Sequence, residues 1–222
     1  MARGSSLFSC LAVLVAGIFL VPAARCAETT VLQHPLAGLE GLFDSLEKFN
    51  RETSACVVMV DLTDPAELPK LLAKPGGLSR LRSVAARMTA LSGLDCYSFH
   101  YTQLQRTALD RAGVKAIVIR PPAPAKLLTC VAARDEFWAL LRETRTPVIG
   151  FCGGFHQIYL AFGGTCSDMR RLAAGEPDTH PAYCPGFLKE WGFTQVRVQK
   201  RDPLFEGLGP ELTVLEQHVS EC

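Results

Sequence analysis

The chain has 222 residues, of which 48% are hydrophobic and 20% are charged, and its formal net charge is +1. This length and composition suit one domain with a substantial core and a terminal extension. Because the charge is near zero and no basic stripe alternates with aromatic residues, we expect no nucleic-acid partner. The sequence also lacks any Cys-x-x-Cys pair or Cys/His cluster at metal-ligand spacing, so we predict no metal and no cofactor.

The N-terminal segment, residues 1–27, has the order of parts found in a secretory signal. Arg3 supplies a positive charge, residues 7–21 are apolar, and small residues including Ala24 precede the polar stretch that starts at Glu28. The apolar run is shorter than the roughly 20 residues of a membrane span. We therefore predict export to the periplasm or the extracellular space, with an uncleaved membrane anchor as the alternative.

Helices and strands are predicted to alternate through the rest of the chain. Residues 28–54 are expected to form a helical extension, with an amphipathic helix over 36–53. The pattern then predicts a strand over 56–62, helices within 65–94 with a break at 75–77, a strand over 96–100 and a helix over 103–112.

The same alternation continues toward the C-terminus. It predicts a strand over 114–119, a helix over 132–143, a strand over 147–151 and a helix over 156–162, followed by more exposed strands over 194–198 and 212–215. Strands that alternate with helices predict an α/β domain over 55–222. We expect a three-layer sandwich whose central sheet is mostly parallel and is covered on both faces.

A Gly-x-Cys-x-Gly motif, Gly150-Phe151-Cys152-Gly153-Gly154, joins a predicted strand to a predicted helix. A nucleophile on such a tight turn needs glycines beside it to avoid clashes with the strand and the helix. The start of the helix would favour a thiolate and offer N–H groups to an oxyanion. The alternative interpretation is a buried structural cysteine beside a glycine turn.

The longer context, TPVIGFCGGFHQIYLAFGG over 146–164, closely resembles the nucleophile segment of class I glutamine amidotransferases, a family that includes γ-glutamyl hydrolase-like members. The stretch DPLFEGL over 202–208 also resembles that family, and the resemblance extends from Cys56 to the C-terminus. It implies a flavodoxin-like layout. It also implies a reaction in which a cysteine attacks a glutamine side-chain amide and a histidine acts as base and acid.

The resemblance assigns roles residue by residue. Cys152 corresponds to the nucleophile, and Gly153 to a backbone oxyanion donor. The family's second donor comes from a Gly-rich loop, but here that region is rich in proline, which has no N–H. Ala123 is therefore the candidate donor in this loop. An ungapped alignment places His156 where the family has a substrate-contacting glutamine, with Gln157 the next residue on the helix.

One departure from the family concerns the base. The family has a His-x-Glu pair near its C-terminus, and this sequence contains none. We therefore expect either that the domain over 55–222 is incomplete at its C-terminus or that another group replaces the base. His218 is the candidate substitute, whereas His180 is expected in a solvated surface loop.

Three functional hypotheses follow. The first is a thiol amidohydrolase acting on a small molecule, either glutamine or a γ-glutamyl compound, and export favours a γ-glutamyl hydrolase-like role. The second is a catalytically inactive binding domain or truncated fragment on the same scaffold. The third, less favoured by the motif context, is the related class of intracellular-protease-like and chaperone-like proteins.

The nine cysteines agree with export, because disulfides persist in oxidising compartments. If Cys10 and Cys26 belong to the signal and Cys152 is a free nucleophile, six cysteines remain for disulfides. Sequence alone does not determine their pairing. The pair expected first is Cys166–Cys184, which flanks a loop rich in Gly, Pro and charged residues.

Overall fold

The computed structural model describes residues 36, 39, 41–120, 128–200 and 202–222, all within one compact unit over His34–Cys222. The predicted signal at 1–27 and the predicted oxyanion residue Ala123 lie outside the described residues and stay predictions. In the part that is described, no helix is both long enough and apolar enough to cross a membrane.

The central sheet has four parallel strands in the order β2-β1-β3-β4. The strands are β1 (Cys56–Asp61), β2 (Asp95–His100), β3 (Val114–Ile119) and β4 (Val148–Gly150), each at a predicted position. Strand β1 is buried along its whole length, as expected for an apolar strand in the middle of a parallel sheet. The prediction of a parallel sheet is confirmed.

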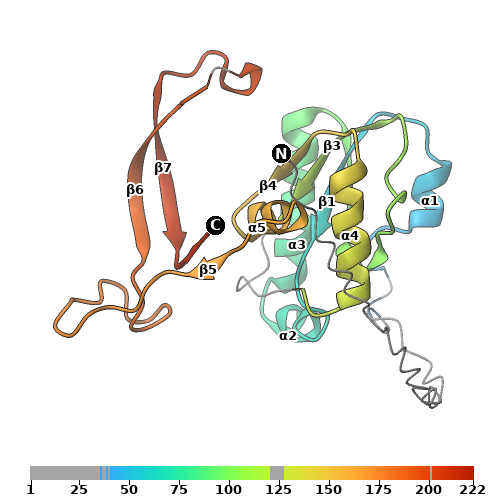
Figure 1. Ribbon diagram of the computed structural model, residues 1–222. Helices are drawn as coiled ribbons and strands as arrows, with labels where there is room; N and C mark the ends of the chain where they lie inside the picture. The colour runs from blue at the N-terminus through green and yellow to red at the C-terminus, as the bar shows by residue number, and fades with distance from the viewer. Residues whose placement is uncertain (1–35, 37–38, 40, 121–127, 201) are drawn as a thin grey trace, which may run out of the picture. The chain divides into compact units, whose positions relative to one another are not determined.

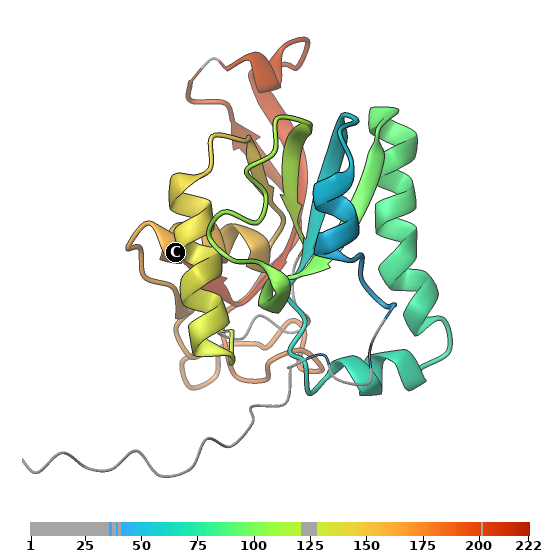
Figure 2. The same ribbon diagram turned by 90° about the vertical axis from the view of Figure 1, so that its right-hand side faces the viewer.

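Helices cover both faces of this sheet (Figure 1). They are α1 (Leu46–Arg51), α2 (Leu68–Ala73), α3 (Gly77–Ser92), α4 (Val131–Glu143) and α5 (Gly153–Ala161). The connection from β1 to β2 through α3 and the connection from β3 to β4 through α4 run in opposite directions across the sheet. Because such crossovers are right-handed, α3 and α4 lie on opposite faces, as Figure 2 shows. This is the predicted three-layer sandwich.

The main core fills the space between the sheet and the helices α1 and α4. Phe49 of α1 packs edge-on against Phe99 of β2, with ring centroids 5.1 Å apart, and both side chains are fully buried. Further members of this cluster are Val58, Val60, Tyr101, Leu104, Leu109, Ile117, Ile119, Phe137 and Leu140. Helix α1 is therefore part of the core that supports the sheet.

Two predicted helices differ from the structure. Of the helix expected over 36–53, Leu46–Arg51 is helical; just before it, the backbone N–H of Asp44 donates to the carbonyl of Ser98 at 2.8 Å, so this segment bonds to β2 instead. The helix expected over 103–112 is wrong. A short 3₁₀ turn, η1 (Tyr101–Gln103), forms there and is closed by the side chains of His100 and Gln103.

Arg111 explains why the chain after η1 does not continue as a helix. Its guanidinium donates to the carbonyl of Phe49 at 2.6 Å and to that of Ser54 at 2.9 Å. These bonds hold the segment before β3 against the segment before β1. A tertiary contact thus overrides the local helical pattern.

The C-terminal part contains two small antiparallel pairs. Strands β6 (Glu190–Arg197) and β7 (Glu211–His218) form a hairpin whose connection includes a 3₁₀ turn, η2 (Pro203–Phe205), and β5 (Ser167–Asp168) pairs with β8 (Ser220–Glu221). The predicted exposed strands are therefore present and longer than expected.

The disulfide joins Cys166 to Cys222, so the expected Cys166–Cys184 pair is wrong. In the antiparallel register Ser167 lies opposite Glu221, which brings the residues just outside that pair to a Cα separation of 4.2 Å. Cys184 is a free thiol. Strand pairing between distant segments decides the connectivity, and the loop composition that suggested Cys184 does not.

Candidate functional site

Cys152 occupies the tight turn between β4 and α5. Its backbone has φ 50° and ψ −118°, and its thiol is exposed. Among the described non-glycine residues, Cys184 alone shares a positive φ. A positive φ is unfavourable for a residue with a Cβ and marks a strained position such as a nucleophile elbow. The structure therefore gives Cys152 the backbone geometry that the motif predicted.

The two outer glycines of the motif are required by close backbone packing. A Cβ on Gly150 would lie 2.5 Å from the backbone nitrogen of Phe155, in the first turn of α5. A Cβ on Gly154 would lie 2.5 Å from the carbonyl oxygen of Ile119 on β3. Both separations are shorter than van der Waals contact allows. The spacing Gly-x-Cys-x-Gly thus lets strand and helix meet closely enough to form the turn.

The N-terminus of α5 presents backbone N–H groups beside Cys152. The N–H of Gly154 donates to the carbonyl of Phe151, and that of Phe155 to the carbonyl of Cys152, both at 2.8 Å. The N–H of Gly153 has no acceptor within the described part of the chain. Because helix N-termini carry partial positive charge, this free donor suits a developing oxyanion.

A pocket of about 960 Å³ contains the thiol. Cys152, Phe155 and His156 line it from the elbow and α5, while Glu216 and His218 line it from β7. Residues of β8 and Cys222 complete the lining. The structure therefore brings three predicted site residues, Cys152, His156 and His218, to one cavity, and Gly153 is adjacent to the first.

The two histidines influence each other, and one of them has a carboxylate partner. Burial lowers the pKa of His156 below its ordinary value of 6.5, and the charge of His218 lowers it further. Nε2 of His218 lies 2.6 Å from Oε2 of Glu190 on β6. Sequence reasoning missed Glu190, since only the register of the β6–β7 hairpin places it opposite His218.

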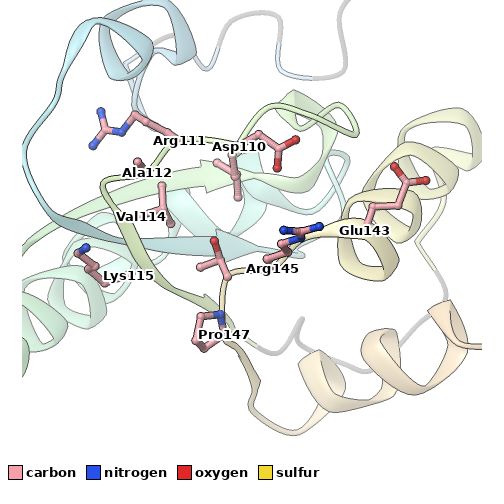
Figure 3. Close-up of a pocket in the computed structure, with 10 residues that line it drawn as sticks. Asp110, Arg111, Ala112, Val114, Lys115, Glu143, Arg145 and Pro147 are labelled. Carbon is pink, nitrogen blue, oxygen red and sulfur yellow. The ribbon is translucent and has the colours of Figure 1, made fainter.

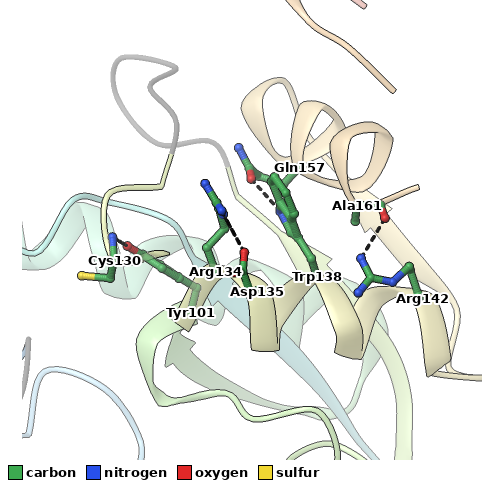
Figure 4. Close-up of polar contacts among 8 residues, drawn as sticks. All are labelled: Tyr101, Cys130, Arg134, Asp135, Trp138, Arg142, Gln157 and Ala161. Atoms are coloured by element: carbon green, nitrogen blue, oxygen red, sulfur yellow. Dashed lines mark hydrogen bonds and ion pairs between the residues drawn. The ribbon is translucent and has the colours of Figure 1, made fainter. Parts of the chain in front are cut away.

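Gln157 points away from this pocket, toward α4. Its side chain is 3% exposed, and its Oε1 accepts a hydrogen bond from Nε1 of Trp138 at 3.0 Å (Figure 4). His156, one position earlier, lines the cavity instead, in agreement with the ungapped alignment. His180, expected to be solvated, stacks on Trp191 with ring centroids 4.4 Å apart.

A buried ion pair anchors the loop that follows β3. Asp61, at the end of β1, is 1% exposed, and its Oδ2 lies 3.1 Å from Nη1 of Arg120. The other carboxylate oxygen accepts from the N–H of Thr63 at 2.8 Å. Arg120 immediately precedes the region where the second oxyanion donor was predicted, so this pair fixes where that region begins.

A second hollow, of about 540 Å³, lies at the opposite edge of the sheet (Figure 3). Its lining includes Asp110, Val114, Lys115 and Pro147, which stand at the starts of β3 and β4 or just before them. In open parallel sheets, ligands bind outside the carboxyl ends of the strands. Cys152 follows the carboxyl end of β4, so the pocket around Cys152 is the stronger candidate site.

Two clusters of residues bring potential metal ligands together. Ligand atoms of Glu190, Glu216 and His218 lie within 4.8 Å of one another, a donor set of oxygen and imidazole that could accept a divalent cation. His156, Cys166 and Cys222 also lie close together, but the two sulfur atoms are bonded to each other and do not offer thiolates.

Comparison with known proteins supports the fold. No protein-family model and no curated protein matches the sequence. Among solved structures, the chain is similar to a protein from Thermoplasma acidophilum that is provisionally described as the glutamine amidotransferase component of GMP synthase. The TM-score is 0.50 and the identity 19%, over 77% of this chain and 68% of that chain. The chain thus has the α/β fold of class I glutamine amidotransferases, with a flavodoxin-like layout.

Proposed function

We propose that this protein is a thiol amidohydrolase that acts on glutamine or a small γ-glutamyl compound, with Cys152 as nucleophile. The observation that carries the proposal is the conformation of Cys152: an exposed thiol at positive φ, between two glycines that admit no Cβ, opening into a pocket with two histidines. A structural cysteine needs none of these features. The glutamine amidotransferase-like fold supports the same reaction type.

The reaction proceeds in two halves. In the first, a base takes the thiol proton, the sulfur attacks the carboxamide carbon, and the oxyanion is held by the N–H of Gly153. The C–N bond breaks as the base returns its proton to nitrogen, which releases ammonia or an amine and leaves a γ-glutamyl thioester. In the second half, water attacks the thioester, the C–S bond breaks, and the proton lost by water restores the thiol.

We also propose that the reaction takes place outside the cytoplasm. The signal-like segment over 1–27 supports export, and the Cys166–Cys222 disulfide suits an oxidising compartment. An exported enzyme has no evident biosynthetic partner to receive ammonia. This favours hydrolysis of γ-glutamyl compounds over transfer of ammonia to a second substrate.

The test is release of ammonia and glutamate from glutamine and from γ-glutamyl peptides by the purified chain. Cys152→Ser should abolish turnover, whereas Cys184→Ser, which removes another free thiol at positive φ, should leave it unchanged. Turnover that survives Cys152→Ser, or a folded wild-type protein without turnover on any of these substrates, would refute the proposal.

Alkylation by iodoacetamide gives an independent readout of the thiol. At pH 8 we expect Cys152 to react first because it is exposed, while Cys56 is buried. Burial raises the pKa of Cys96 to about 11, so about one molecule in a thousand carries the thiolate there at this pH. Peptide mapping of the labelled protein identifies the modified residue.

A further inference from the structure

We propose that His218, oriented by Glu190, is the general base that serves Cys152. The inference rests on the proposed function and supplies the group that the missing His-x-Glu pair would otherwise provide. His218 was a candidate from sequence, whereas Glu190 emerges from the structure alone. The histidine and the carboxylate come from two neighbouring strands, not from one short motif.

The hairpin register places the two side chains on one face. Glu190 of β6 is the direct partner of His218 of β7, and side chains of directly opposed residues point to the same side. The 2.6 Å separation between Oε2 of Glu190 and Nε2 of His218 is short enough for a charge-assisted hydrogen bond once the imidazole takes up a proton. A carboxylate at this position stabilises the imidazolium that forms when the base accepts the thiol proton.

The next pair of the register keeps space open beside the histidine. Glu216 lies two residues before His218 and so on the same face, and its partner across the hairpin is Gly192, which has no side chain. A Cβ added at Gly192 would meet nothing within 4 Å. His218 is thus flanked by carboxylates from both strands while the neighbouring position is empty, which suits a base that must receive a substrate.

His218 fits the role of base better than His156 does. Both line the pocket of Cys152, but no ion pair of His156 is found in the described ranges, whereas His218 has Glu190. The lowered pKa of His156, caused by burial and by the charge of His218, keeps His156 neutral when His218 is protonated. His156 is therefore suited to a polar contact with substrate.

The strand end that carries His218 is anchored on the residue that follows it. The carbonyl of Val219 accepts from the N–H of Met169 at 2.7 Å, and Val219 itself is buried. Three residues further on, Cys222 is bonded to Cys166. These two links tie the end of β7 to the segment that follows α5, the helix beginning at Cys152. Such links limit how far the base can move from the nucleophile.

The experiment measures kcat/KM against pH for hydrolysis of the best γ-glutamyl substrate, in the presence of a chelator so that no metal occupies the two glutamates and the histidine. His218→Gln should lower kcat/KM by about 10²- to 10⁴-fold. Glu190→Gln should lower it by about 10-fold or more. It should also move the acidic limb of the profile to lower pH, because the imidazolium loses its carboxylate partner.

Matched controls come from the same region. Glu211→Gln makes the same chemical change on the same hairpin, at an exposed ion pair with Arg197, and should leave both the rate and the profile unchanged. His180→Gln removes a histidine outside the pocket lining. Glu190→Asp, which keeps the charge, should restore the acidic limb, a result that a merely structural role for Glu190 would not produce.

The outcomes separate this inference from the proposed function. Cys152-dependent turnover that persists within threefold in His218→Gln overturns the inference alone. A Glu190→Gln profile that coincides with the wild-type profile overturns the positioning role of Glu190. A wild-type protein without Cys152-dependent turnover overturns the proposed function and this inference with it. Thermal unfolding of each variant establishes that the chain is folded.

Discussion

The indole Nε1 of Trp138 on α4 donates a hydrogen bond to Oε1 of Gln157 on α5 at 3.0 Å (Figure 4). A second bond runs from Nη1 of Arg142 to the carbonyl of Ala161, also at 3.0 Å, near the end of α5. Together they attach α5 to α4 along its length. Since Cys152 immediately precedes α5, these bonds determine where the nucleophile stands relative to the sheet.

The bond between Trp138 and Gln157 should contribute measurably to stability. Gln157→Leu removes the acceptor and leaves a partly buried indole N–H without a partner, which costs about 1–3 kcal/mol of the free energy of unfolding. Urea unfolding at equilibrium measures the change. The matched control is Gln195→Leu, which breaks an exposed hydrogen bond to Thr213 in the hairpin and should cost far less. Equal losses in the two variants would contradict this account.

Alanine at Gly150 should distort the elbow. Its Cβ would lie 2.5 Å from backbone atoms of Gly154 and Phe155, so strand or helix must shift; overpacking of this kind costs about 1–3 kcal/mol. We expect a lower melting temperature and lost amidase activity. Gly209→Ala, where the nearest atom would be 3.7 Å from the new Cβ, is the control and should be tolerated. Full activity in Gly150→Ala would show that the close approach is not needed for catalysis.

The disulfide between Cys166 and Cys222 should stabilise the chain and support the site. It closes a loop with a sequence separation of 56, for which the loss of chain entropy in the unfolded state corresponds to about 4 kcal/mol. Replacing both cysteines with serine should therefore lower the melting temperature and reduce amidase activity, because the end of β7 is freed. Cys184→Ser should change neither. Non-reducing peptide mapping that links Cys166 to Cys184 would contradict the structure.

His156 should make the protein less stable in mild acid. Because its folded-state pKa is lowered by burial and by His218, the unfolded chain takes up a proton more readily than the native state does below about pH 6.5. The contribution of His156 to stability is present above that pH and is lost as the pH falls through the folded-state pKa. Chemical denaturation between pH 7.5 and 5 should therefore show a shallower decline in His156→Gln than in wild type, with His180→Gln as control. Parallel declines in wild type and His156→Gln would refute this prediction.

Much of the α/β domain was predictable because its elements announce themselves locally. Apolar runs such as the one in β1 form buried strands in any parallel sheet, and the Gly-x-Cys-x-Gly spacing reflects contacts among residues within a few positions of each other. The same holds for α4, whose apolar residues recur at helical spacing. These features depend on neighbours in the chain, and so the sequence reveals them.

The incorrect predictions share a different cause. The segment after His100 fails to form a helix because Arg111 bonds to carbonyls about 60 positions earlier, and the segment before α1 bonds to β2. Cys166 pairs with Cys222 because β5 and β8 meet in an antiparallel register. Each result depends on contacts between distant segments, which residue patterns do not encode in a readable form.

The candidate site divides along the same line. Sequence by itself determined the nucleophile Cys152, the glycines around it and the α/β class, because strand, turn and helix follow one another directly in the chain. Tertiary structure alone decided that His156 and His218 line the same pocket and that Glu190 is the partner of His218. The physical reason is that a base and its carboxylate need proximity in space, and here strand register supplies it between residues 28 positions apart in number, Glu190 and His218.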